Sequence, residues 1–120
     1  MSYKGITEIY ATIKRLSANL RTLETIKNME RLPTPGVVIP NREVQKEKAK
    51  AYLYKVKSII GAYKKQGLID ESEKRKIYEI IDTMVKEVEN DNYMAAFNMI
   101  DLLESEVYGI AIKVSMPFRR

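Results

Sequence analysis

Residues 41–67 read NREVQKEKAKAYLYKVKSIIGAYKKQG and form the most basic stretch of the chain. On a helix of this sequence, apolar residues between Val44 and Tyr63 fall on one side and lysines fall on another. Asn41 suits the N-cap position, and Gly67 suits a left-handed helix end. The stretch therefore predicts an amphipathic helix over residues 42–66. The sequences on either side of it predict the helices that pack against it.

One sector of this helix, about 80° wide at 100° per residue, carries five basic side chains. Lysines at helical spacing bind phosphates without reading a base sequence. Tyr54 lies between two of them in helical order, where it is placed to stack on a base. Two arginines at the end of the chain would add a basic arm. The candidate nucleic-acid-binding residues are therefore Arg42, Lys46, Lys50, Tyr54, Lys57, Lys64, Arg119 and Arg120.

The alternative interpretation is a solvated lysine face that the acidic third helix satisfies within the chain. Residues 1–66 carry 14 basic and 5 acidic groups, net +9, and residues 67–120 carry 7 and 11, net −4, which gives the total of +5. Such asymmetry indicates either a face that binds a polyanion or complementary halves that attract each other within or between chains.

Three further helices are predicted over residues 6–30, 71–89 and 93–107. Isoleucines and leucines recur at spacings of three and four from Ile6 to Leu23, which predicts a bundle helix, with a dimerising helix as the alternative. Asp70 and Glu73 have the spacing of a capping box at the start of the third helix. The short connection from Gly67 to Asp70 predicts that the second and third helices are antiparallel neighbours.

The predicted fourth helix is apolar nearly all round, so it needs cover on several sides. A central position in the bundle is expected, and an oligomer interface is the alternative. Beyond it, residues 107–114 suit either a continued helix or a strand paired with residues 37–39. Pro117 ends any helix and leaves a short basic tail, 116–120.

Residues 32–40 read LPTPGVVIP and interrupt the helical pattern. Their prolines predict an extended connection, and Val37, Val38 and Ile39 are too apolar for a simple solvated linker. The fold class expected for residues 1–120 is therefore a single all-α domain. It is a four-helix bundle with a proline-rich crossover between the first and second helices.

The composition argues against catalysis, because the chain contains no cysteine, histidine or tryptophan. Thiolate and imidazole metal sites are excluded, and the commonest general acid–base group is missing. No phosphate-binding glycine loop is present, so no enzyme, cofactor or metal is expected. No apolar run is long enough for a membrane span, and residues 1–10 lack a secretory signal. An intracellular protein, cytoplasmic or virion-borne, is expected. Abundant Lys, Ile, Tyr and Glu without Cys indicate a thermophilic source.

Two functions are consistent with these patterns. The first is a small non-enzymatic protein of a nucleoprotein or virion that binds nucleic acid through the basic helix and self-associates. The alternative is a protein–protein interaction subunit, an inhibitor or an assembly building block without nucleic-acid contact. In either case the apolar fourth helix or the seam of the first helix is the expected surface for protein partners.

Overall fold

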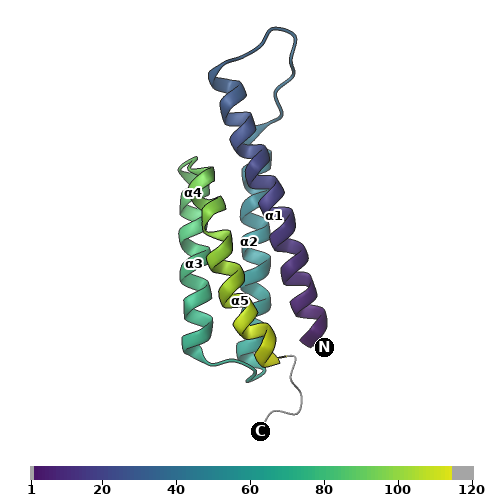
Figure 1. Ribbon diagram of the computed structural model, residues 1–120, viewed down its shortest axis with the longest axis vertical. Helices are drawn as coiled ribbons and strands as arrows, with labels where there is room; N and C mark the ends of the chain where they lie inside the picture. Colours follow the sequence, from purple (N-terminus) through teal and green to yellow (C-terminus); the bar gives the residue numbers. More distant parts are fainter. Residues whose placement is uncertain (1, 115–120) are drawn as a thin grey trace.

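Helix accounts for most of the chain in the computed structural model, which describes residues 2–114 (Figure 1). The helices are α1 (Ser2–Arg31), α2 (Arg42–Lys65), α3 (Glu71–Glu89), α4 (Tyr93–Asn98) and α5 (Ile100–Val114). None of the residues from 2 to 114 lies in a strand, so the all-α prediction is confirmed and residues 107–114 are helical. The predicted tail, 116–120, lies outside the described residues.

The helices run alternately up and down in an elongated body of 63 × 22 × 19 Å (Figure 1). α1 packs on α2, α2 on α3, and α3 on α4 and α5, which in turn pack on α1. Over the described residues the backbones of α1 and α3 do not approach each other closely, nor do those of α2 and α5, so each rod has two adjacent rods. α4 and α5 form one rod that is interrupted at Met99, whose N–H donates to the Ala96 carbonyl, 3.0 Å away. This is the arrangement of an antiparallel bundle of four rods.

The core lies along the axis between the rods and contains the apolar seam predicted for α1. Ile6 is partly buried and the other members of the seam are fully buried, so the seam is not free to bind a second copy; the fully buried members are Ile9, Ile13, Leu16, Leu20 and Leu23. α5 is not the central helix, because one of its faces remains exposed to solvent. Its buried residues are Ile100, Leu103, Val107, Ile110 and Val114, while Leu102, Tyr108 and Ile112 are exposed.

The sequence signals for helix ends act as predicted. The Asn41 side chain accepts a hydrogen bond from the Val44 N–H at 3.2 Å. At the start of α3, the Asp70 carboxylate accepts from the Glu73 N–H and the Glu73 carboxylate accepts from the Asp70 N–H, both at 2.8 Å. Gly67 ends α2 with a φ of 76°, and the Leu68 N–H donates to the Tyr63 carbonyl. These bonds fix the short turn that makes α2 and α3 antiparallel neighbours.

The proline-rich crossover is not confirmed. α1 and α2 pack against each other as an antiparallel pair, so the segment between them is the loop of a helical hairpin (Figure 1). Pro35 and Gly36 occupy the centre of a β-turn, in which the Val37 N–H donates to the Thr34 carbonyl at 3.2 Å. Gly36 has a φ of 83°, as a type II turn requires at this position. The prolines therefore define a tight turn at the end of the hairpin rather than a strap across the bundle.

Candidate interaction surfaces

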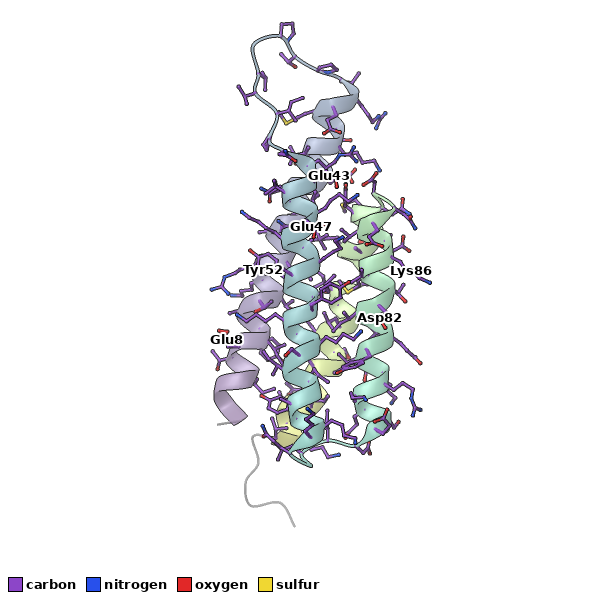
Figure 2. All side chains as sticks on the ribbon, turned by 180° about the vertical axis from the view of Figure 1, so that it is seen from behind. Glu8, Glu43, Glu47, Tyr52, Asp82 and Lys86 are labelled. Atoms are coloured by element: carbon purple, nitrogen blue, oxygen red, sulfur yellow. The ribbon has the colours of Figure 1, made fainter. Side chains whose placement is uncertain are left out.

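The predicted basic sector of α2 faces α3 and the turn that follows α3. Figure 2 shows α2 and α3 side by side, with Asp82 labelled on α3. The Lys57 Nζ lies 2.7 Å from an Asp82 carboxylate oxygen, and the Lys50 Nζ lies 3.2 Å from Glu89. Lys64 is 3.9 Å from Glu71. The sector thus forms a line of ion pairs along the α2–α3 interface.

A further carboxylate, that of Asp91, lies in the turn between α3 and α4 and has three polar partners within 3.0 Å. Its side chain lies 3.0 Å from the Arg42 guanidinium and 3.0 Å from the Lys46 Nζ. The Tyr93 hydroxyl donates to the same carboxylate at 2.7 Å. The Asp91 carbonyl accepts from the Lys27 Nζ at 2.9 Å, which brings in α1. We call these five residues the Asp91 cluster: Lys27, Arg42, Lys46, Asp91 and Tyr93.

Asp91 holds a backbone conformation that usually belongs to glycine. Its φ is 62°, and it occupies the position after the C-cap of α3 that Gly67 occupies after α2. The Asn92 N–H donates to the Glu87 carbonyl at 2.8 Å and the Asp91 N–H to the Val88 carbonyl at 3.1 Å, which is the Schellman pattern. A left-handed residue with a side chain is less favourable than glycine. The ion pairs of the Asp91 carboxylate explain why a side chain is present here.

The cluster shifts the pKa values of its acidic members in opposite directions. The hydrogen bond from Tyr93, together with Lys46 and Arg42, lowers the pKa of Asp91 to about 2. Burial, and donation to the Asp91 carboxylate, raise the pKa of Tyr93 to about 12. Both shifts favour the protonation states that hold the hydrogen bond together, an ionised Asp91 and a neutral Tyr93.

Partial burial distinguishes these cations from ordinary surface lysines. The Lys46 side chain is 12% exposed and the Lys50 side chain 18% exposed, although both belong to the sector predicted to meet phosphates. A nucleic acid bound there would have to replace ion pairs that the fold already makes. The basic sector therefore lies along the seam between α2 and α3, where carboxylates of α3 and the following turn are its partners, as the alternative interpretation of the sequence expected.

A different part of α2 faces the solvent. Tyr54 is half exposed, as predicted, and exposed lysines lie on the same side of the helix: Lys48, Lys55 and Lys65. Lys55 lies 3.1 Å from Glu8 of α1. Of the eight predicted nucleic-acid-binding residues, the structure thus presents Tyr54 openly and places five at the seam; Arg119 and Arg120 lie outside the described residues.

The hairpin end was not among the predicted site residues, because the sequence left residues 32–40 open as either a packed strap or a binding loop. Lys27 and Arg42 contact the α3–α4 turn, so residues 28–41 project beyond the rest of the bundle (Figure 1). Leu32 is 78% exposed and Val38 88% exposed, and Val37 is also exposed. We call Leu32, Val37 and Val38 the hairpin tip. The apolar run Val37–Ile39 was the available signal, since a solvated linker does not need it.

The described residues contain no group of three or more metal-ligating side chains close enough to hold an ion. Among residues 2–114, none of the helices combines the length and the hydropathy that a membrane span requires. Comparisons with protein-family models, curated proteins and solved structures found no match to the chain. Inferences about function therefore depend on the geometry of these surfaces.

Replacing Asp91 with Asn should lower the free energy of unfolding by about 1–2 kcal/mol, because Arg42 and Lys46 lose an ionised partner in a partly buried position. Asn tolerates the left-handed conformation, so the change isolates the charge. Urea unfolding followed by circular dichroism measures the effect. Glu79→Gln, on the exposed side of α3, is the matched control and should change stability by less than about 0.5 kcal/mol. Equal stability of Asp91→Asn and wild type would contradict the importance of the cluster.

Stability should fall at both extremes of pH. Asp91 has a folded-state pKa of about 2, below the ordinary 3.8, so its contribution is present above pH 3.8 and is lost as the pH falls towards 2. Tyr93 has a folded-state pKa of about 12, above the ordinary 10.0, so its contribution is present below pH 10 and is lost as the pH rises towards 12. Urea midpoints across these ranges test both signs. The Asp91→Asn variant should lose less stability in acid than wild type, and parallel acid profiles would count against the assignment.

Proposed function

We propose that the protein is a non-enzymatic protein-interaction module that docks the hairpin tip into an apolar pocket of a partner protein. The observation that carries the proposal is the exposure of Leu32 and Val38 at the far end of a projecting hairpin. An isolated exposed leucine needs no explanation, but neighbouring apolar residues at the end of a projection are typical of an interaction site.

The construction of the hairpin supports this role. The β-turn at Pro35 and Gly36 restricts the conformations of the tip before a partner is met, which reduces the entropy lost on binding. Behind the tip, Glu30 lies 3.1 Å from the Arg42 guanidinium and joins α1 to the start of α2. The Asp91 cluster then ties both helices to the bundle. A rigid projection with an apolar end can therefore insert into a pocket without folding on arrival.

The tip proposal predicts a position-dependent contact. Because the chain has no cysteine, Val38→Cys and Tyr54→Cys each give one site for a photo-reactive label. In an extract of the cells in which the protein occurs, the label at position 38 should capture one protein that the label at position 54 does not. Equal capture from the two positions would contradict a docking tip.

The captured protein, once purified, allows a direct affinity test by calorimetry. Leu32→Ser with Val38→Ser should weaken its binding by ten-fold or more, because each change removes an apolar side chain from the contact. Tyr54→Ser, which alters an exposed residue on the side of the bundle, is the control and should leave the affinity unchanged. An unchanged affinity for the double variant would rule the proposal out.

Nucleic-acid binding is the second candidate function, and the solvent-facing side of α2 favours it. Lys48, Lys55 and Lys65 accompany Tyr54 there, and the chain carries a net charge of +5. Lys48 and Lys65, together with Lys64, whose side chain is 42% exposed, are more open to phosphates than the partly buried Lys46 and Lys50 of the α2–α3 seam. Reversing the charge of Lys46 or Lys50 would break ion pairs of the fold and would confuse lost contacts with lost stability.

Lys48→Glu with Lys65→Glu avoids that problem, since neither lysine pairs with a carboxylate among the described residues. Fluorescence anisotropy of a labelled DNA duplex, and of an RNA of equal length, measures the affinity at low and near-physiological salt. If nucleic acid is a ligand, wild type should bind more weakly as salt rises, and the double variant should bind at least ten-fold more weakly. Absence of binding at low salt, or equal binding by the variant, would exclude this candidate.

A further inference from the structure

We propose that two copies of the chain pair through the outward face of α5, as an antiparallel pair of helices related by a two-fold axis. The face consists of Leu102, Ser105, Tyr108, Gly109 and Ile112. Three of these are large apolar residues exposed to solvent, at 50% for Leu102, 61% for Tyr108 and 42% for Ile112. The face lies on a different helix from the hairpin tip, so this pairing goes beyond the proposed docking of a partner protein.

The outward face of α5 has few charged residues, unlike that of its neighbour α3. The exposed residues of α3 include Glu71, Arg75, Lys76, Glu79, Asp82, Lys86 and Glu89. On α5 the charged residues beside the apolar ones are Asp101, which is exposed, and Glu106 and Lys113, which are partly buried. Lys113 pairs with Glu73 of α3. A charged outer face disfavours contact between copies of a bundle. A weakly charged face with large apolar residues is typical of a contact surface.

Gly109 is the residue that points to close approach by another helix. Glycine inside a helix is about 1 kcal/mol less favourable than alanine, so its presence needs a reason. For Gly61 the reason lies within the chain, since a Cβ there would lie 2.7 Å from the Tyr78 hydroxyl. A Cβ at Gly109 would meet nothing within 4 Å. The packing of one copy therefore does not explain Gly109, whereas a helix lying directly on it would.

The order of side chains on the face indicates that the approaching helix is α5 of a second copy. Leu102, Ser105, Gly109 and Ile112 run large, small, small, large, symmetrically about residue 107, and the same symmetry places Tyr108, the most exposed residue of the face, at the level of Glu106. In an antiparallel pair centred there, Leu102 lies at the level of the second copy's Ile112, and Ser105 at the level of its Gly109. A two-fold interface needs this kind of self-complementarity, because each patch meets itself.

Charge favours the antiparallel over the parallel arrangement. A parallel pair would bring Asp101 next to its own counterpart, which is unfavourable. In the antiparallel pair each Asp101 lies about 9 Å from the centre along the helix axis, on opposite sides, which separates the two carboxylates by about 18 Å at 1.5 Å per residue. That separation exceeds the distance over which salt screens charges under physiological conditions.

Sedimentation measurements over a range of protein concentrations test the pairing. Wild type should show a reversible monomer–dimer equilibrium, and Leu102→Glu with Ile112→Glu should weaken it at least ten-fold. Tyr54→Glu, at a residue that is also 50% exposed, is the matched control and should leave the dimer intact. Circular dichroism checks that every variant is folded. A wild-type protein that stays monomeric at every concentration, or a double variant that dimerises like wild type, would overturn the proposal.

Gly109→Ala separates folding from pairing because its two expected effects have opposite signs. In the monomer, at concentrations below the dissociation constant, alanine should raise the urea midpoint, since it favours helix and has free space. In the dimer the added methyl group should keep the helices apart and weaken association several-fold. Unchanged association would overturn the close approach at residue 109. Leu32→Ser with Val38→Ser should dimerise normally, so failure of the tip proposal remains distinguishable from failure of this one.

Discussion

The ion pairs of Asp91 with Arg42 and Lys46 are the interaction on which the shape of the molecule depends. They fasten the α3–α4 turn to the α1–α2 hairpin at the level where the bundle stops and the projection begins. The left-handed residue of this turn is Asp91 rather than a glycine. The carboxylate is ionised at neutral pH and its partners are partly buried. The ion pairs therefore attract the two segments and also determine where they meet.

Much of the fold was predictable from local signals. The capping residues at Asn41 and Asp70, the left-handed Gly67 and the 3–4 spacing of apolar residues in α1 each determine structure over a few residues, and each acts as expected. The crossover expected between α1 and α2 is not confirmed, since the prolines of this loop indicate only an extended or turning chain. Whether such a segment crosses a bundle or closes a hairpin depends on which helices pack together, and that is not a local property.

The basic sector of α2 shows why the periodicity of a sequence alone does not locate a binding site. Helical periodicity correctly grouped Arg42, Lys46, Lys50, Lys57 and Lys64 on one side, but it could not show that this side faces α3. The opposite net charges of residues 1–66 and 67–120 did indicate such pairing, because the partners of these cations are acidic residues of α3 and the following turn. The hydrogen-bond network of Asp91 involves three segments that are distant in sequence, so no spacing rule could identify it. Once the lysines are assigned to the seam, the exposed surfaces of the described residues that suggest binding are the hairpin tip, the outer side of α2 and the outer face of α5.

The central claim is that the basic sector of α2 stabilises the fold by binding carboxylates of the same chain. A double-mutant cycle with Lys46→Met and Asp91→Asn, evaluated from urea unfolding, tests it most directly. If the two residues interact as the structure indicates, their coupling free energy should be about 1 kcal/mol or more, and the second substitution should be less harmful once the first is present. Additivity of the two changes within about 0.3 kcal/mol would contradict the claim, and the sector would then have to be regarded as an open basic face.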